Sequence, residues 1–368
     1  MRTTLDYAAY SDAAVFGREQ ERIFRTLWIF AGVRSMLSWP DAFITRSIGG
    51  VPVLLQNCDG IIRAFENQCA HRQMPIQFEE HGTRRMVCRY HGWVYDEAGG
   101  VKAIPDEQTL YRFTPERRAG LRLREFAVAE VGNLVFVNLA DDPIPLELQF
   151  RPEHIERMRA MSQHFSATCI QTVFPVRYNW KFNFENVVDG NHVAYLHPRT
   201  FAPLLRPTTV AESAVPAVAP PAIDMPSLRD ATLNVDSPYQ LKRWPWQEQV
   251  EGFESDERFY DFNIYPNVNF YSPGGKYFII QQFDPAAPDL THYRLTLMTA
   301  RESGKIVGLP AILWGYLKSE KSVLDEDIVA LEQLQASLHP GMRAPQQGEY
   351  EAPLLNIAAV YRQLMGDA

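Results

Sequence analysis

Four potential metal ligands stand close together in the first third of the chain. They are arranged as C-A-H, then sixteen residues, then C-R-Y-H, which gives Cys69, His71, Cys88 and His91. The chain has only four cysteines in 368 residues, too few for a disulfide framework. A clustered Cys/His pattern in a reducing compartment therefore predicts metal binding.

Two kinds of metal centre fit these ligands. Structural zinc sites also use two cysteines and two histidines, but they usually pair like ligands, as C-x(2–4)-C and H-x(3–5)-H. Here each loop supplies one cysteine and one histidine. A Rieske [2Fe–2S] centre, with cysteines on one iron and histidines on the other, matches that division, so iron–sulfur is favoured over zinc. The segment resembles the Rieske motif C-x-H-x(16)-C-x-x-H, although Gln73 stands where many relatives have glycine.

A second candidate centre lies in the stretch NWKFNFENVVDGNHVAYLHP, residues 179 to 198. His192 and His197 are five positions apart, and on a regular helix they would point about 140° apart. Pro198 pushes the residue before it out of the α region, so His197 can leave the helix and converge with His192. Two unrelated histidines near a helix end remain the alternative.

A carboxylate for this centre is sought in SVLDEDIVALEQLQASL, residues 322 to 338. On a helical wheel the apolar residues of this segment fall within about 120° of one another. Asp327 lies inside that stripe, whereas Asp325 and Glu326 point away from it. A carboxylate on a buried helix face needs a partner, either a metal or a salt bridge. Two histidines and one carboxylate form the facial triad of a mononuclear non-haem iron(II) site, with Asp327 as the third ligand and Asp325 as the fallback.

Composition narrows the class of protein. The net charge is −8 and no basic tail is present, which argues against nucleic acid as a partner. No apolar run approaches the length of a membrane span, and the N-terminus lacks the apolar core of a signal peptide. We therefore expect a soluble, cytoplasmic protein without a membrane partner.

The order of the predicted elements indicates an α+β protein with an inserted β domain. Apolar residues at helical spacing predict one helix over 12 to 37. Short β runs separated by Gly-containing turns follow. We expect an N-terminal helical segment (1–39), a small all-β domain (40–145) and a larger α+β domain (146–368). The last should contain a strand leading into a helix over 165 to 190, long antiparallel strands, and a helix from about 309 to 338.

Together these features resemble the α (oxygenase) subunit of the Rieske non-haem iron aromatic-ring-hydroxylating oxygenases, over nearly the whole chain. The catalytic motif of that family reads roughly N-x-x-D-x-x-H-x(4)-H. This sequence supplies Asn186, Asp189, His192 and His197 at those positions. Asn191 stands where many members have tyrosine.

The resemblance implies a Rieske [2Fe–2S] domain inserted in a helix-grip-like catalytic domain that carries mononuclear Fe²⁺. It implies a terminal oxygenase that uses O2 and NAD(P)H-derived electrons, received through a reductase or ferredoxin. The substrate would be a small aromatic or related apolar compound, modified by mono- or dihydroxylation or by demethylation. The alternative is a non-catalytic Rieske electron carrier, or a zinc module, fused to a small-molecule-binding domain.

The resemblance also implies a homotrimer in which the cluster of one subunit lies beside the mononuclear iron of the next. Asp189 would then hydrogen-bond His192 of its own subunit and His91 of the partner subunit. Because Asp189 precedes His192 by three positions, we expect both on one helix face. Asn186, one turn earlier, is expected to face the iron.

Substrate and donor contacts are less sharply marked. Apolar residues that flank the ligands could line a pocket or form plain core: Phe182, Phe184, Val193, Phe201 and Leu204. Asn267 and Asn269 are candidates for polar substrate contacts, and the proline-rich loop 214–226 for a cover. Four arginines around the Rieske loops could form a docking patch for an acidic electron donor or an ordinary charged surface: Arg72, Arg84, Arg85 and Arg89.

Overall fold

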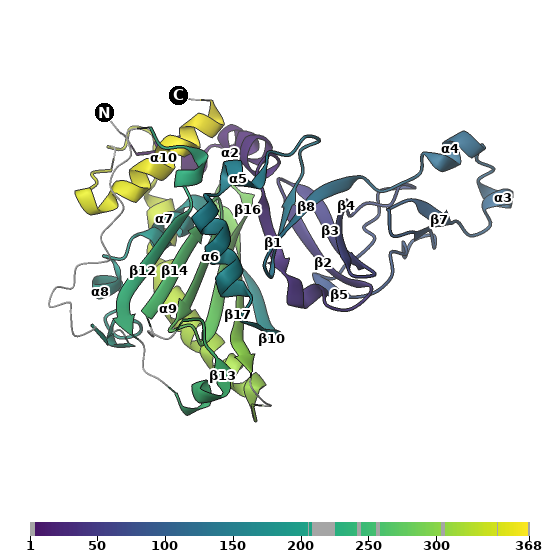
Figure 1. The fold of residues 1–368 in the computed structure, drawn as a ribbon. Helices are drawn as coiled ribbons and strands as arrows, with labels where there is room; N and C mark the ends of the chain where they lie inside the picture. Colours follow the sequence, from purple (N-terminus) through teal and green to yellow (C-terminus); the bar gives the residue numbers. More distant parts are fainter. Residues whose placement is uncertain are drawn as a thin grey trace. The chain divides into compact units, whose positions relative to one another are not determined.

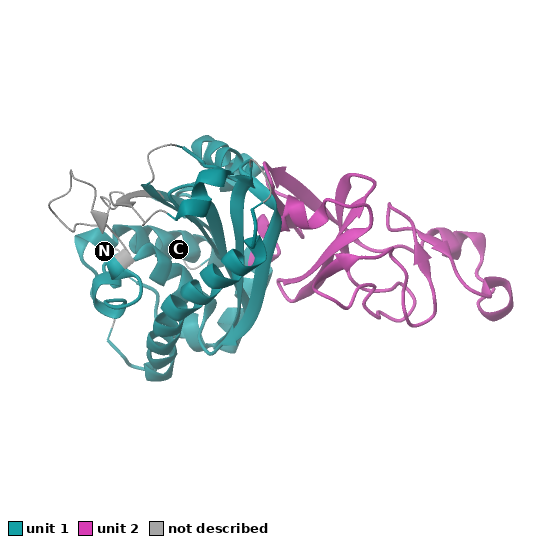
Figure 2. Cartoon of the chain, turned by 90° about the horizontal axis from the view of Figure 1, so that it is seen from below, with its two compact units in different colours: residues 1–23, 145–368 teal, residues 24–144 magenta. Residues whose placement is uncertain are grey.

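The computed structural model describes residues 4–204, 206–207, 225–240, 244–254, 258–302, 306–343 and 345–366. The chain forms two compact units, one of residues 24–144 and one of residues 1–23 with 145–368 (Figure 2). The smaller unit is therefore inserted in the sequence of the larger one. None of the described helices combines the length and apolar character that a membrane span requires.

The smaller unit is built on a seven-stranded antiparallel sheet with the order β1-β9-β8-β4-β3-β2-β5 (Figure 1). Its strands are β1 (Ile29–Val33), β2 (Ala42–Ile48), β3 (Val51–Cys58), β4 (Ile61–Glu66), β5 (His81–Thr83), β8 (Glu125–Val131) and β9 (Leu134–Asn138). The turn between β3 and β4 shows why the sequence folds this way. Asp59 and Gly60 both have positive φ, 50° and 98°, as an Asp-Gly hairpin turn requires.

The candidate ligands of the smaller unit lie outside this sheet. The first loop follows β4, and the second lies between β5 and the hairpin of β6 (Val94–Tyr95) and β7 (Val101–Ala103). Two short helices, α3 (Glu107–Leu110) and α4 (Pro115–Ala119), follow the hairpin. Buried residues from the sheet, the loops and the hairpin form one core that includes Cys69 and Cys88, the candidate cysteine ligands.

The predicted helix over 12 to 37 is wrong in its second half. The segment starts with α2 (Ala13–Glu19), preceded by α1 (Ala8–Ser11), and continues as a π-helical turn, η1 (Gln20–Phe24). The chain then enters strand β1, followed by a 3-10 turn, η2 (Arg34–Leu37). Every residue of β1 is buried. A short run buried on both faces carries no periodicity that separates strand from helix, and pairing with β9 decides the outcome.

The larger unit contains an antiparallel sheet with the order β10-β17-β16-β15-β14-β12-β11. Its strands are β10 (Phe165–Val176), β11 (Arg206–Pro207), β12 (Leu233–Gln240), β14 (Arg258–Ile264), β15 (Val268–Pro273), β16 (Tyr277–Ala287) and β17 (Leu290–Glu302). The short strand β13 (Val250–Glu251) also pairs with β17. The expected long antiparallel strands are thus present.

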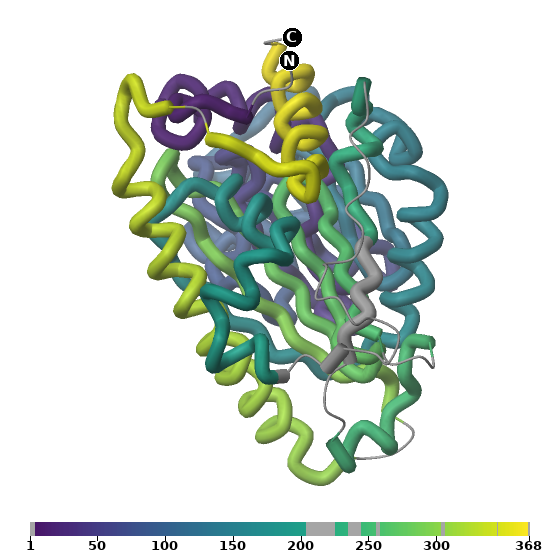
Figure 3. The backbone as a smooth tube through the Cα atoms, turned by 90° about the vertical axis from the view of Figure 1, so that its left-hand side faces the viewer, coloured from purple at the N-terminus to yellow at the C-terminus, as the bar shows by residue number. Residues whose placement is uncertain are grey.

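Helices cover both faces of this sheet (Figure 3). The helices are α5 (Leu146–Gln149), α6 (Pro152–Ser162), α7 (Trp180–Val188), α8 (Val193–Leu196), α9 (Leu309–Ser337) and α10 (Ala352–Met365). Short 3-10 turns complete the unit: η3 (Ala202–Leu204), η4 (Leu228–Asp230), η5 (Pro245–Gln249) and η6 (Glu349–Glu351).

Side-chain contacts identify which helix covers which face. On one face, His154 of α6 meets Phe262 of β14, with ring centroids 5.6 Å apart. On the other, Lys321 of α9 lies over the ring of Phe174 in β10, and Tyr271 of β15 donates a hydrogen bond to Glu320 of α9. The face turned toward α9 is called the interior face below, because the second candidate centre belongs to that side.

Candidate metal centres

The two Rieske-like loops share one backbone design. In each loop the cysteine N–H donates to the carbonyl five residues on, and the N–H four residues on donates back to the cysteine carbonyl. The fourth position is Gln73 after Cys69 and Gly92 after Cys88, and both have positive φ, 60° and 71°. The departure from glycine at Gln73 therefore puts a side chain where the backbone favours glycine.

The four donors separate into a histidine pair and a cysteine pair. The Nδ1 atoms of His71 and His91 are 3.1 Å apart, and both rings are half-buried. Cys69 and Cys88 are 2% and 1% exposed, and their side chains contact each other. Among the described residues, no three of these four donors lie within 4.8 Å of one another. A tetrahedral zinc ion would hold all four donors within about 4 Å, so the separation supports a two-iron cluster.

Tyr95 and Trp93 support the ligands of the first loop. The Tyr95 hydroxyl donates to Cys69 Sγ at 3.0 Å and accepts from the Ala70 N–H at 2.9 Å. Burial raises the pKa of the Cys69 thiol, while the hydrogen bond from Tyr95 opposes that rise. Trp93 stacks on His71 with ring centroids 5.0 Å apart and holds its plane. Hydrogen bonds to cysteine sulfurs tune the reduction potential of an iron–sulfur cluster, and packing holds a histidine ligand in its orientation. Both kinds of support are present here.

The second candidate centre is assembled from two segments far apart in sequence. Helix α7 begins at an N-cap, Asn179, whose side chain accepts the Lys181 N–H, and it ends at Val188. His192 precedes the short helix α8 and His197 follows it, with φ −113° and ψ 41° outside the α region. The chain thus turns before Pro198, as predicted. Asp327 lies on α9, on its buried side.

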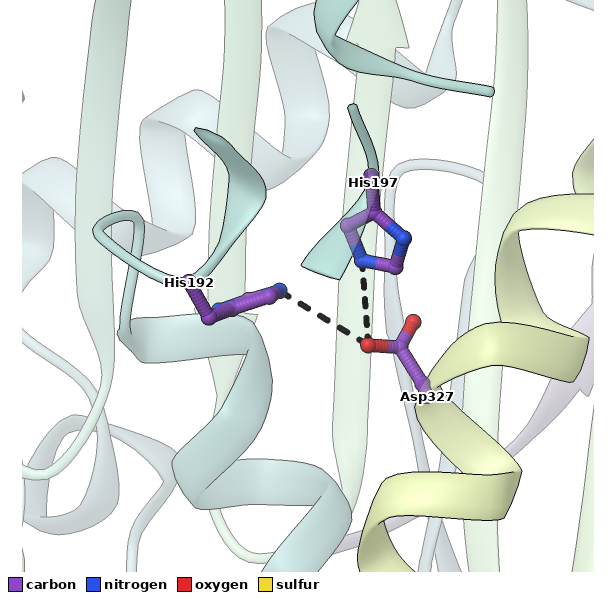
Figure 4. Close-up of side chains that lie close together, drawn as sticks. All are labelled: His192, His197 and Asp327. Atoms are coloured by element: carbon purple, nitrogen blue, oxygen red, sulfur yellow. Dashed lines mark ion pairs between the residues drawn. The ribbon is translucent and has the colours of Figure 1, made fainter. Parts of the chain in front are cut away.

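These three side chains converge (Figure 4). His192, His197 and Asp327 can each offer one ligand atom such that all lie within 4.8 Å of one another. The Nε2 atom of His197 is 3.1 Å from Asp327 Oδ1, and the Nε2 atom of His192 is 3.7 Å from the same oxygen. Two imidazoles and one carboxylate that approach a common centre from one side are the donor set of mononuclear non-haem iron. Such iron keeps open coordination positions on its other side. The donor set therefore fits the implied metal.

Glu326 supports this centre, although its place on the helical wheel suggested otherwise. Its Oε2 atom lies 2.7 Å from His197 Nδ1 and accepts a hydrogen bond from Thr200 at 2.5 Å. Burial acts to lower the pKa of His197, but hydrogen bonds with Asp327 and Glu326 raise it above its usual value. A carboxylate on Nδ1 fixes the tautomer that leaves Nε2 free for a metal. In the sequence, only the place of Glu326 next to Asp327 could have suggested that Glu326 supports the site.

The structure corrects the expected placement of Asp189. Helix α7 stops one residue before it, and Asp189 has extended φ and ψ of −89° and 100°. Asp189 and His192 therefore do not share a helix face. The Asp189 carboxylate still lies near His192, with Oδ2 3.7 Å from Nδ1, and its other oxygen accepts the Asn191 N–H. A short non-helical turn, and not helical periodicity, brings the two together.

Other predicted residues have mixed outcomes. Asn186 donates to Asp327 Oδ1 at 3.2 Å and so contacts a candidate ligand. The fallback Asp325 is 59% exposed and pairs with Lys321. Phe182 stacks on Tyr10, which places it in the packed core.

Of the remaining pocket candidates, Phe184 packs against Tyr265, and Phe201 lies 6.5 Å from His197 between ring centroids. The Leu204 side chain and residues 214–224 of the cover loop lie outside the described residues.

The predicted arginine patch is not uniform. Arg84 binds Gln77 and backbone carbonyl groups, so it supports the loop. Arg89 pairs with Glu79 at 2.7 Å, and Arg85 is 84% exposed. Arg72 lies over the ring of Tyr90, which is itself 53% exposed. The rings of Tyr90 and His91 are in contact, so Arg72 and Tyr90 form an exposed basic and aromatic surface beside the candidate histidine ligands.

Two family models match the chain. The Rieske [2Fe-2S] domain matches residues 27–115, and the ring hydroxylating alpha subunit (catalytic domain) matches residues 154–367. The chain therefore belongs to the ring-hydroxylating alpha subunit family and carries a Rieske domain ahead of the catalytic domain. The [2Fe–2S] cluster and the mononuclear iron are the cofactors of these two domains. The family resemblance and the predicted cofactors are confirmed.

Several named proteins are similar to this chain. The α 2 subunit of the terminal oxygenase component of terephthalate 1,2-dioxygenase from Comamonas sp is 31% identical over 53% of this chain and 49% of its own length. The α subunit of the methanesulfonate monooxygenase hydroxylase from Methylosulfonomonas methylovora is 34% identical over 39% of this chain and 37% of its own length. The chain spans about half the length of the first of these two relatives.

Solved structures agree on the fold. A quaternary ammonium Rieske monooxygenase superposes with a TM-score of 0.77 at 20% identity, covering 98% of this chain and 95% of that one. A naphthalene 1,2-dioxygenase gives 0.75 at 17% identity, covering 99% and 92%. The predicted fold class, a small β domain inserted in an α+β catalytic domain, is confirmed.

Proposed function

We propose that the chain is a terminal oxygenase component. It would use O2 and electrons from NAD(P)H, delivered by a reductase or ferredoxin, to hydroxylate or oxidatively demethylate a small aromatic or related compound. The observation that carries this proposal is the convergence of His192, His197 and Asp327 within 4.8 Å in a chain that also has a Rieske domain. The sequence placed the Rieske domain at 40–145, but β1 (Ile29–Val33) pairs with β9 in the same sheet. We therefore assign the smaller unit, residues 24–144, to the Rieske domain, and residues 1–23 with 145–368 to the catalytic domain.

In the Rieske domain we assign the cluster to Cys69, His71, Cys88 and His91. When bound, the cluster supplies single electrons and the mononuclear iron supplies open positions for O2. The cysteines are buried, whereas both imidazoles are half-buried. The histidine edge is therefore the part of the loops that an electron acceptor can approach.

In the catalytic domain we assign the iron to His192, His197 and Asp327. The side chains around them keep this set in place. Glu326 holds the Nδ1 side of His197, and Asn186 donates to Asp327. Both contacts restrict rotation of His197 and Asp327, two of the three side chains that would hold the iron, and the iron would supply the open positions at which O2 binds.

We further propose a head-to-tail homotrimer in which Asp189 links the two centres. Asp189 would hydrogen-bond His192 of its own chain and His91 of the partner subunit. In the single chain the Asp189 oxygen lies 3.7 Å from His192 Nδ1, close enough for a small shift to form the bond. Asp189→Ala should keep both metal centres and lose most turnover. Activity at the wild-type level in a fully metallated variant would remove this role.

We propose that the electron donor is acidic and docks on the exposed surface of Arg72, Arg85 and Arg89. Charge attraction between partners speeds encounter and weakens as salt is added. The reduction rate should therefore fall with ionic strength, and a rate insensitive to salt would exclude docking there. The four free cysteines agree with a reducing, cytoplasmic setting.

Metal analysis tests the proposal as a whole. Iron, zinc and acid-labile sulfide are measured per chain on anaerobically purified protein, with an EPR spectrum after reduction. We expect about three irons and two sulfides, because the cluster has two irons and the His/His/Asp site one. Two irons and two sulfides that persist after iron(II) reconstitution would indicate an electron carrier. Zinc without sulfide would show that Cys69, His71, Cys88 and His91 bind zinc and not an iron–sulfur cluster, which would overturn the proposal.

A further inference from the structure

The interior face of the large sheet carries polar side chains at adjacent positions. Asp261 and Asn263 are two residues apart on β14, so they point to the same face. Asn263 lies directly opposite Asn269 on β15, and Asp261 lies opposite Tyr271. Residues directly opposite in an antiparallel pair have Cβ atoms about 5 Å apart. Asp261, Asn263 and Asn269 therefore form one group, here called the interior polar patch.

This patch belongs to the same side of the sheet as the candidate iron ligands. Tyr271 donates to Glu320, which lies on α9 seven residues before Asp327. Seven residues are about two helical turns, so Glu320 and Asp327 share one face of α9. Phe259, two residues before Asp261, contacts Phe201, with centroids 5.9 Å apart.

The ring contacts continue to the metal centre, because Phe201 in turn contacts His197. An unbroken path of aromatic contacts thus joins β14, beside the patch, to an iron ligand. Phe259 also stacks with Tyr271, centroids 5.4 Å apart, next to Asp261 in the register. The patch is bordered by aromatic faces on the side that leads to His197.

Four side-chain atoms of the patch lack hydrogen-bond partners, although Asn269 Nδ2 donates to Gln281 at 3.3 Å. Asp261 Oδ1, Asn269 Oδ1, and both Oδ1 and Nδ2 of Asn263 are buried and make no hydrogen bond with the part of the chain that the structure describes. Asn263 is 0% exposed and Asn269 4% exposed. Buried polar atoms are nearly always paired, and each exception calls for a cause. Three of these four atoms are acceptor oxygens, so what the patch lacks is mainly a hydrogen-bond donor.

The electrostatics of Asp261 agree with a missing cation. Burial raises the pKa of its carboxyl to about 8, opposed by a hydrogen bond from the Phe262 backbone N–H. By contrast, the buried carboxylate of Glu19 in the same unit is paired with Lys181 at 2.5 Å, and that of Glu320 accepts a hydrogen bond from Tyr271. Asp261 as a whole is half-buried, but its Oδ1 atom is buried. A buried carboxylate oxygen with no basic partner is stabilised when a positively charged ligand reaches it.

We propose that the interior polar patch binds the ammonium nitrogen of the substrate, so that the substrate is a small primary or secondary amine. This assignment rests on the proposed oxygenase function and narrows its substrate class. The N–H groups donate to the oxygens of Asp261, Asn263 and Asn269. The faces of Phe259 and Tyr271 add cation–π attraction. The carbon skeleton of the amine then extends along the aromatic path toward the metal centre.

Calorimetric titration of the iron-replete protein tests this proposal without turnover. The probes are two sets of three compounds with matched skeletons: isobutylamine, isobutanol and isobutyrate, and 2-phenylethylamine, 2-phenylethanol and phenylacetate. At least one amine should bind tenfold or more tightly than its matched alcohol and carboxylate. Asp261→Asn, which keeps the size but removes the charge, should abolish that preference. Amines that bind no better than their matched compounds in both sets would overturn the proposal.

Two further variants separate a local effect from misfolding. Asn269→Leu removes one acceptor at similar volume and should weaken amine binding several-fold with less effect on the alcohol. Asp289→Asn changes an exposed acid in the turn between β16 and β17 and should leave binding unchanged. An equal loss in all three variants would overturn the assignment. Iron and sulfide are measured on the same samples, so a missing third iron would count against the oxygenase proposal and not against the patch.

Discussion

Tyr95 provides a direct test of how the Rieske domain sets the potential of its cluster. Its hydroxyl donates to Cys69 Sγ at 3.0 Å and accepts the Ala70 N–H at 2.9 Å, and the side chain is 5% exposed. The change Tyr95→Phe keeps the ring and removes only these two hydrogen bonds. In the cluster-loaded protein the sulfur is a thiolate, and a donor stabilises it more when the cluster carries an extra electron. The reduction potential should therefore fall.

The size of the fall follows from the strength of the lost bond. A hydrogen bond to a charged group contributes about 1.5–3 kcal/mol, of which the difference between the two redox states is roughly 1 kcal/mol. For a one-electron couple about 59 mV corresponds to about 1.4 kcal/mol, so we expect a fall of about 40 mV. The Ala70 N–H also loses its acceptor, which should lower the thermal stability of the loop.

An EPR-monitored redox titration of the reduced cluster measures this shift. Tyr111→Phe is the matched control, because its ring packs on His71 at 5.4 Å but its hydroxyl makes no hydrogen bond to a cysteine ligand among the described residues. The control should stay within about 10 mV of wild type. A Tyr95→Phe potential that equals the wild-type value, with the cluster fully assembled, would refute the reasoning.

Four further changes have expected outcomes. Glu326→Ala removes the hydrogen-bond partner of a histidine ligand, and iron(II) titration should show an affinity lower by about 10–100-fold. Gln73→Gly relieves a positive φ of 60° and should raise the free energy of unfolding by about 1 kcal/mol, measured on the holoprotein. Gly92→Ala should lower it, because a Cβ there would lie 3.0 Å from a proline side chain. Lys181→Met leaves the fully buried carboxylate of Glu19 without its positively charged partner, so the free energy of unfolding should fall by about 3–5 kcal/mol.

Each of these outcomes has a control on the same chain. Asp325→Asn changes the neighbour of Glu326 that pairs only at the surface, so iron affinity should not move. Equal iron affinity in Glu326→Ala and wild type would show that the contact to His197 does not matter. If Gln73→Gly lowers the free energy of unfolding instead, the Gln73 side chain stabilises the protein by more than its positive φ destabilises it. Adding Glu19→Gln to Lys181→Met should recover part of the lost stability, since the unpaired charge is removed.

The sequence was sufficient where the chemistry is local. Cys69 and Cys88 each lie within three residues of a candidate histidine ligand, so residue types and spacing alone predicted a Rieske domain here. The same holds for the candidate ligands His192 and His197, because Pro198 ends the short helix that lies between them. Asp327 could be predicted because helical periodicity marks a carboxylate on an apolar face. Each of these inferences needs only distances along the chain.

Tertiary structure decided what depends on contacts between distant segments. Pairing with β9 made 29–33 a strand, although a short run buried on both faces could equally have been helical. Glu326 reaches His197 because α9 packs beside the chain after α8, which no helical wheel shows. The interior polar patch exists only through the register of β14 with β15, since Asp261 and Asn269 are ordinary strand residues when read singly. Local spacing determines which atoms can bind a metal, and packing determines which other groups surround it.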